Sequence, residues 1–361
     1  MKLVCAGRSS SRYSSLPRWQ AWLVLGTTIA LLAWCLVVST KIHLLDFTDI
    51  ELPDGPDSAL FREVVRRVRA GESYYDVSYQ ELKSRDYPIV SLFNWRLPTW
   101  AWVIGRLPDT EWASWLLVAF SFIAAAMAAI IVLRECGLGS TLGLIILLTG
   151  AFIWTVLYDN FLCPELWSGV LMMLSVSALG LGWRALGLGA GLLALAIREL
   201  ALPYVVLATV LAWWEGRRRE GVAWLVGLAL FGAFLALHGM EVARRVPDMD
   251  RTLGASWVEF HGLHFVLLTC RMNALVWWSP SWGIAVYLVL SLLGLAGWRG
   301  PTGALIALTC FGYLAAFCVV GKLINVYWGW MYAPLLTFGL VRAPGALRDL
   351  FIVAWGKHGK C

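Results

Sequence analysis

The sequence predicts an all-α protein: a polytopic bundle of transmembrane helices with a long outer first loop that contains short helices. Of its 361 residues, 60% are hydrophobic and only 14% are charged, whereas soluble domains carry about 25% charged residues. Long apolar runs recur along the chain, many of them close to the roughly 20 residues that a spanning helix needs. The 22 Trp and 34 Gly residues suit membrane interfaces and close helix packing. We therefore expect a single membrane domain over residues 1–361.

About ten membrane segments are expected, two of them short. The first, 19–38, follows a basic stretch of the kind that begins a signal peptide. It is long enough to span the membrane and no small-residue cleavage site follows it, so we interpret it as an uncleaved span. Further spans are expected at 112–133, 139–157, 166–183, 223–237, 282–298, 303–320 and 327–340.

Two other stretches are ambiguous. Residues 184–216 are interrupted by Arg198 and Glu199, so they form either one long kinked helix or two short helices. The part before Arg198 is too short to span the membrane alone. We therefore favour a hairpin that holds Arg198 and Glu199 in the protein interior, near the outer side. Residues 264–278 contain an Arg and an Asn, which favours a position along the membrane interface rather than a span.

The basic residues lie at segment ends rather than on one soluble face. The net charge of +6 therefore indicates membrane topology, and no nucleic-acid partner is expected. The positive-inside rule places both termini in the cytoplasm, together with Arg134, Arg184, 217–219, Arg299 and the tail 342–360. It places outside the first loop, 41–97, and also 159–165, 241–261 and Lys322.

The first loop contains a candidate helix with a carboxylate at its start. Asp57 precedes apolar residues at helical spacing from Phe61 to Val68, and Gly71 is expected to end the helix. A carboxylate at this position accepts backbone N–H groups at the helix N-terminus. Capping alone is the simpler interpretation of Asp57 on the local pattern, and a catalytic role is the alternative.

Five further charged residues lie at or within the expected membrane segments. Arg96, just before the membrane, either binds a phosphate bidentately or anchors the chain at the interface. Glu165 opens a helix, where the dipole favours a carboxylate. Arg198 and Glu199 interrupt an apolar stretch, which indicates either a functional site or a mutually paired structural couple. Lys322, at the outer surface, is a candidate phosphate contact.

The sequence lacks the motifs of nucleotide-driven transport and soluble-cofactor chemistry. There is no Walker A loop, no Gly-x-Gly-x-x-Gly between a strand and a helix, and no Gly-x-Ser-x-Gly. His261 and His264 are three residues apart, but no carboxylate stands at the next helical position, so no metal site is expected there. A donor substrate would therefore have to come from the membrane.

Several short motifs occur in order along residues 46–350. They are 57–61 (DSALF), 70–75 (AGESYY), 87–88 (YP), 96–99 (RLPT), 165–167 (ELW), 198–201 (RELA) and 327–329 (YWG). In their order and spacing the chain resembles membrane glycosyltransferases of the GT-C class, which use polyprenyl-phosphate sugars. Within that class it is most similar to bacterial membrane proteins of cell-surface glycopolymer formation.

The resemblance implies an inverting sugar transfer at the outer face of a bacterial inner membrane. The donor would be a polyprenyl-phosphate sugar, and the acceptor a cell-surface glycan or a lipid, with membrane lipids around the protein. No cofactor beyond the lipid-linked donor is implied, and the need for a divalent metal is left open. The general base that deprotonates the acceptor hydroxyl matches Asp57, with Asp49 and Asp54 as open alternatives.

The resemblance also implies which residues bind the substrates. Arg96, Arg198 and Lys322 would stabilise the lipid phosphate as it leaves. Glu165 would position the donor or the acceptor sugar. The remaining residues that we include in the expected substrate-binding set are Tyr75 and Glu199.

Two other functions compete with sugar transfer. In a transporter or flippase for a lipid-linked glycan, Arg198 and Glu199 would line a translocation path. The outer helix with its carboxylate favours the transferase, and the sequence shows no internal repeat of the kind that transporters carry. A non-catalytic subunit of a glycan-assembly complex is the third interpretation. The transferase hypothesis predicts that Asp57, Arg96, Glu165 and Arg198 converge on one cavity between the first loop and the membrane.

Overall fold

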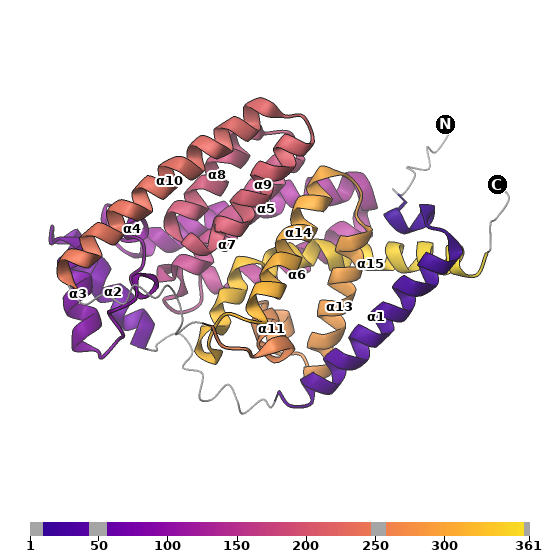
Figure 1. Ribbon diagram of the computed structural model, residues 1–361, viewed down its shortest axis with the longest axis horizontal. Coiled ribbons are helices and arrows are strands. Elements are labelled where there is room, and N and C mark those ends of the chain that lie inside the picture. Colours follow the sequence, from indigo (N-terminus) through magenta and orange to yellow (C-terminus); the bar gives the residue numbers. More distant parts are fainter. Residues whose placement is uncertain (1–9, 43–55, 247–257, 357–361) are drawn as a thin grey trace.

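The computed structural model describes residues 10–42, 56–246 and 258–356, without the side chains of residues 56 and 57. Within these ranges every regular element is a helix (Figure 1), as the sequence predicts. The helices pack around one large hydrophobic core. A small satellite core forms where the N-terminal segment meets the C-terminal helix.

Within the described ranges, five helical segments are long and apolar enough to cross a membrane. This supports a membrane-embedded protein, while the expected count of about ten spans remains a prediction. They are α1 (Arg18–Ser39), α5 (Glu111–Cys136), Leu138–Thr155, α10 (Arg218–Arg245) and α14 (Gly300–Phe317). The third combines α6 (Leu138–Phe152) and η4 (Ile153–Thr155).

Residues 184–216 form two short helices, as favoured from the sequence. The first is α8 (Arg184–Ile197), and after η6 (Glu199–Ala201) the second is α9 (Leu202–Trp214). Arg184, at the start of α8, lies 3.5 Å from Glu220, in the first turn of α10. Because α10 directly follows α9, α8 and α9 must run in opposite directions. The predicted hairpin is therefore confirmed.

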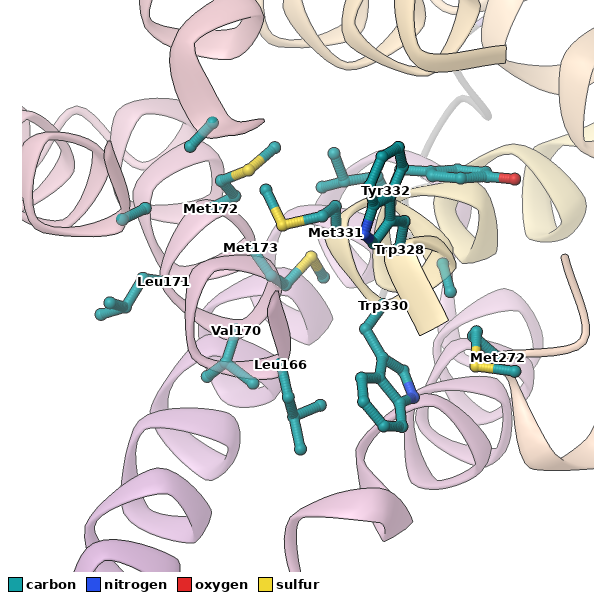
Figure 2. Packing of buried hydrophobic residues seen from close by; sticks show 14 of the residues in the cluster. Leu166, Val170, Leu171, Met172, Met173, Met272, Trp328, Trp330, Met331 and Tyr332 are labelled. Carbon is teal, nitrogen blue, oxygen red and sulfur yellow. The ribbon is translucent and has the colours of Figure 1, made fainter. Parts of the chain in front are cut away.

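The centre of the bundle is α7 (Pro164–Gly180), whose residues are buried on every side as far as Leu179. Close approach requires glycine at Gly169, where an added Cβ would lie 2.1 Å from the carbonyl oxygen of Trp330. Figure 2 shows Met173 of α7 pointing toward Met331 across this contact. A helix that is apolar all round is expected in the interior, and α7 carries its one charged residue, Glu165, into the core.

The C-terminal part differs from the expected span at 327–340. Residues there form η8 (Leu323–Met331) and then α15 (Ala333–Ala354), which continues through the stretch expected to be a basic tail. The helix continues because its charges are paired. Arg342 lies 2.6 Å from Glu135 and 3.5 Å over the Trp298 ring.

Residues 264–278 do not form a spanning helix. They are divided between α11 (Gly262–Cys270) and α12 (Ala274–Trp277), and α13 (Ser281–Gly297) follows. The nine residues of α11 extend only about 14 Å at 1.5 Å per residue, which is less than half the thickness of a bilayer core.

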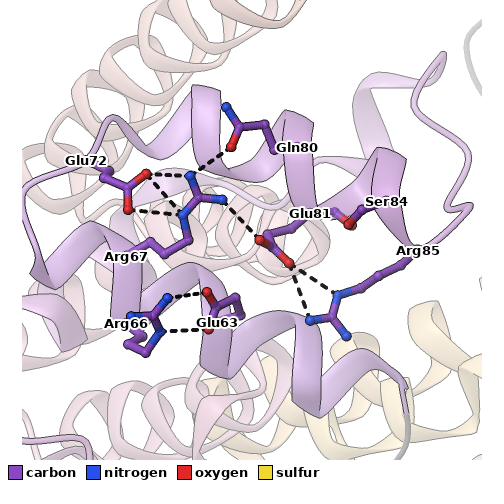
Figure 3. Close-up of polar contacts among 8 residues, drawn as sticks. All are labelled: Glu63, Arg66, Arg67, Glu72, Gln80, Glu81, Ser84 and Arg85. Carbon is purple, nitrogen blue, oxygen red and sulfur yellow. Dashed lines mark hydrogen bonds and ion pairs between the residues drawn. The ribbon is translucent and has the colours of Figure 1, made fainter.

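The first loop folds into short helices, as predicted. They are α2 (Pro56–Arg69), α3 (Tyr74–Ser84) and η3 (Leu92–Asn94), and α4 (Pro98–Gly105) follows directly after the loop. Gly71, with φ of +91°, makes the turn after α2. Figure 3 shows Arg67 of α2 between Glu72, Gln80 and Glu81, which fixes α3 against α2.

The loop helices lie at the opposite end of the molecule from the basic turns at Arg134, Arg184, 217–219 and Arg299. Figure 1 shows α2 and α3 at the left, and the start of α1 and the end of α15 at the right. At the second end, Gly180 of α7 lies against Ile131 of α5 and Thr302 of α14, so the turns after α5 and α7 and before α14 lie together. We call these two ends the loop end and the basic end. The turns that carry Arg134, Arg184, 217–219 and Arg299 lie at the basic end. That this end faces the cytoplasm remains a prediction.

Candidate functional site

A cavity of about 320 Å³ lies at the loop end between the first-loop helices and η8. Its walls are mostly apolar, with Phe61 and Val64 from α2, Trp100 from α4 and Ile324 from η8. The charged residues that line it are Arg96 and Lys322, and no carboxylate of the described chain lines it. We call it the loop cavity. Its chemistry suits an anion attached to an apolar group.

Arg96 is held in place from several directions. Its Nη2 donates to the Tyr327 hydroxyl at 3.1 Å and lies 3.5 Å from Oε1 of Glu165. Its guanidinium lies 5.8 Å from the centre of the Phe61 ring, and its backbone carbonyl accepts the Tyr74 hydroxyl. The side chain therefore keeps a defined position at the boundary between the cavity and the core.

Below Arg96 the charges alternate into the protein interior. Glu165 is fully buried, and its Oε1 lies 2.9 Å from Nε of Arg198. Arg198, only 2% exposed, also pairs with Glu199 through Nη1. Burying isolated charges is costly unless they are paired. The four charges sum to zero, which explains how this chain tolerates them beneath the cavity.

Local structure brings these residues together. Pro164 begins α7, which leaves Glu165 in the first turn, where the helix dipole favours a carboxylate. Arg198 has extended backbone angles, φ −144° and ψ 116°, at the break between α8 and η6. This break places Arg198 beside Glu165 in the first turn of α7, in the protein interior. Oε2 of Glu165 is buried without a hydrogen-bond partner among the described residues.

Lys322 belongs to the same polar chain through the turn that begins η8. The Asn325 side chain accepts the backbone N–H of Lys322 at 3.2 Å and donates to the Tyr327 hydroxyl at 3.3 Å. The ammonium of Lys322 lies 3.9 Å from a Glu259 carboxylate oxygen, and its side chain is 40% exposed. Lys322 therefore provides a second cation at the cavity.

Tyr75 lies outside the loop cavity, whereas its neighbour Tyr74 lines it. The Tyr75 hydroxyl lies 3.1 Å from Nδ1 of His238, and Arg245 lies over the ring at 5.2 Å. Burial raises the pKa of Tyr75 to about 12. Ser78, one helical turn after Tyr74, also lines the cavity, so Tyr74 and Ser78 share the face of α3 that the cavity contacts.

Asp57 is the second residue of α2, and its side chain lies outside the described residues. Asp49 and Asp54, the alternative bases, also lie outside them. Phe61, one helical turn after Asp57, lines the cavity. Of the four residues expected to line one cavity, Arg96, Glu165 and Arg198 contact one another. Of these three, only Arg96 lines the loop cavity, so the expectation is wrong for Glu165 and Arg198. The position of the Asp57 carboxylate remains a prediction.

Arg62 of α2 forms an ion pair with Asp159. This contact joins the first loop to the segment before α7, which was expected on the same side of the membrane.

Among the described residues, no group of three or more His, Cys, Asp or Glu side chains is placed to hold a metal ion. In comparisons with known proteins, no family model, no curated protein and no solved structure matches the chain.

Proposed function

We propose that this protein is a membrane glycosyltransferase that takes its sugar from a polyprenyl-phosphate donor. The observation that carries the proposal is the loop cavity, which combines apolar walls with two cations and has no lining carboxylate among the described residues. A polyprenyl-phosphate sugar has the same two features, an apolar chain and an anionic phosphate. The acceptor would be a cell-surface glycan or a lipid.

Arg96 is the residue best placed to bind the donor phosphate. Arginine binds phosphate oxygens through two parallel N–H groups, and contacts with Tyr327 and Glu165 fix its guanidinium in advance. A group held in this way needs no reorganisation when charge develops on the leaving phosphate. Lys322, which also lines the cavity, would supply a second positive charge.

Glu165, Arg198 and Glu199 act as positioning residues in this proposal. They do not line the cavity, but Glu165 joins Arg96 to Arg198 through its Oε1. The sequence-based expectation that Arg198 and Glu199 touch substrate is therefore replaced by a role in orienting Arg96. This distinction is testable, because a positioning residue acts only through Arg96.

The reaction is an inverting displacement. Asp57 removes the proton from the acceptor hydroxyl, and the acceptor oxygen attacks the anomeric carbon from the face opposite the phosphate. The bond between that carbon and the phosphate oxygen breaks, and the electron pair leaves with the polyprenyl phosphate. The proton remains on Asp57, which is one turn from the cavity-lining Phe61 along α2.

The direct test compares lipids and surface glycans from cells that lack the protein with those from cells restored by variants at equal expression. Asp57→Asn and Arg96→Gln are expected to leave the surface polymer without one sugar while its lipid donor accumulates, as mass spectrometry would detect. Asp86→Asn is the matched control. Asp86 is exposed in the same loop at φ of +57°, a conformation that Asn tolerates.

The outcomes separate three functions. If Asp57→Asn restores the polymer, Asp57 is not the base. If Arg96→Gln also restores it, the chain is better explained as a non-catalytic assembly subunit. If the complete glycan accumulates on its lipid at the inner leaflet, the protein is a transporter or flippase.

The tyrosine pair provides an independent check of the cavity. Tyr74→Phe removes the hydroxyl that binds the Arg96 carbonyl, and one such hydrogen bond contributes about 1 kcal/mol. We expect weaker donor binding, by about fivefold, in a titration with purified protein. Tyr75→Phe should leave donor binding unchanged, since its hydroxyl faces His238 outside the cavity. Equal effects of the two variants would contradict this assignment of the donor site.

A further inference from the structure

A second cavity, of about 640 Å³, lies at the basic end and takes no part in the proposed sugar transfer. It is bounded by the end of α5, the starts of α6 and α14, and the middle of α15. We call it the basic cavity. The 17 residues of α7 separate the two ends by about 25 Å at 1.5 Å per residue.

Two of the arginines that line the basic cavity are paired with carboxylates. Arg342 is 8% exposed, and it is held by Glu135 at 2.6 Å and by the Trp298 ring at 3.5 Å. Arg348 lies 2.8 Å from Asp349. The Arg342 pair joins α15 to α5, and each of the two pairs is electrically neutral.

The other two arginines leave the cavity positively charged. Arg134 and Arg299 both line it and are exposed, and neither forms an ion pair within the described chain. Arg299 donates to the carbonyl of Ser11 at 2.9 Å. Four arginines against the carboxylates of Glu135 and Asp349 leave a balance of about +2, because +4 and −2 sum to +2.

The helix geometry adds to this positive potential. The N-termini of α6 and α14 both open into the cavity, at Gly137 and at Arg299 respectively, and no side chain caps either of them. The N-terminus of a helix carries a partial positive charge and exposes backbone N–H groups that bind anions. The arginines and the two helix N-termini therefore all favour an anionic ligand.

Exposed apolar residues at the edge of the basic cavity favour a lipid ligand over a soluble anion. Leu133 at the end of α5 and Leu138 at the start of α6 both line the cavity, and they are 49% and 65% exposed. Both helical segments are long and apolar enough to span a membrane. A ligand whose phosphate enters the cavity would therefore place its acyl chains along α5 and α6.

We propose that the basic cavity binds the phosphate headgroup of an anionic phospholipid, with Arg134 and Arg299 as the recognising cations. Such a lipid would fix α5, α6, α14 and α15 together at this end. Basic cavities between membrane helices are suitable sites for anionic headgroups. The proposal does not depend on the proposed sugar transfer.

The test uses the purified full-length chain in a mild detergent and measures bound lipid by native mass spectrometry. Phosphatidylglycerol is titrated against phosphatidylcholine, which has no net charge. Each arginine near an anionic lipid surface strengthens binding about fivefold. We therefore expect Arg134→Gln to weaken phosphatidylglycerol binding about fivefold, and the double variant R134Q/R299Q about 25-fold.

The control is R218Q/R219Q, which removes the same charge from exposed residues at the start of α10, outside the cavity. It should change binding by less than twofold. Arg299 also holds the N-terminal segment through its hydrogen bond to Ser11. If its loss makes the double variant unstable, the single Arg134→Gln variant is used instead. Its melting temperature should equal that of the wild type.

Three results would overturn the proposal. Wild-type protein could bind both lipids equally, or the control could lose as much binding as Arg134→Gln. Inorganic phosphate could also displace phosphatidylglycerol at equal concentration, which would identify a site for soluble anions. Selective phosphatidylglycerol binding that depends on Arg134 would support it.

Discussion

The buried carboxylate of Glu165 offers the sharpest test of how the candidate site is held together. Glu165→Gln keeps the shape of the side chain and removes its charge. Arg198 would lose its 2.9 Å partner and retain only Glu199, and Arg96 would lose its carboxylate at 3.5 Å. Since Glu165 is fully buried, no water is available to replace the lost interaction.

The expected loss of stability follows from this geometry. Removing one partner of a buried ion pair costs about 3–5 kcal/mol, a large part of a total stability of about 5–15 kcal/mol. The assay is reversible unfolding in detergent micelles, monitored by tryptophan fluorescence. Glu199→Gln is the matched control, because Glu199 is 11% exposed and has one arginine partner, Arg198. We expect it to cost less than half as much.

A double-mutant cycle then tests whether Glu165 acts through Arg198. Residues in one ion-pair network show coupling of about 0.5–3 kcal/mol, so Glu165→Gln and Arg198→Gln together should cost clearly less than the sum of the two single changes. If the changes add within about 0.5 kcal/mol, or if Glu165→Gln alone costs less than about 1 kcal/mol, the network does not support the site.

Two further predictions concern the loop helices and the packing of α7. The Arg67 hydrogen bond lowers the pKa of Glu72, so its contribution to loop stability is present above the pKa of the unfolded chain and is lost as pH falls through the lower folded value. The protection factors of amides in α2 and α3, corrected for the intrinsic exchange rate at each pH, should therefore fall as pH drops below the ordinary glutamate pKa of about 4.3. Gly169→Ala would place a methyl group 2.1 Å from the Trp330 carbonyl oxygen and should destabilise the protein by about 1–3 kcal/mol in the same unfolding assay. Gly26→Ala, where nothing lies within 4 Å, should be neutral or stabilising by up to about 1 kcal/mol, and an equal loss in both variants would contradict the close approach of α7 and η8.

Much of the fold follows from the sequence, because apolar length and breaker residues act locally. The long apolar runs predict α1, α5 and α14, and the polar interruption at Arg198 predicts the hairpin of α8 and α9. The helical spacing after Asp57 predicts α2 and its end near Gly71. These elements depend on residues close to one another along the chain.

The C-terminal helix illustrates what local patterns miss. Arg342 looks like the start of a basic tail, yet α15 continues to Ala354. The reason is non-local: Arg342 pairs with Glu135 on α5 and lies over Trp298 at the end of α13. No window of sequence around Arg342 contains these partners.

Some features of the candidate site could likewise be predicted from the sequence, and others could not. The sequence by itself determined that Arg96, Glu165 and Arg198 are unusual charges in an apolar chain, because each one must be paired or must face a cavity. Only the tertiary structure decided that they pair with each other, that Tyr74 rather than Tyr75 lines the cavity, and that Arg96 alone of the three reaches it. The physical reason is that the free-energy cost of burying a charge depends on the charged residue itself and can be recognised from its sequence context. The partner that offsets this cost lies on another helix, so only the packing of helices distant in sequence determines which residue it is.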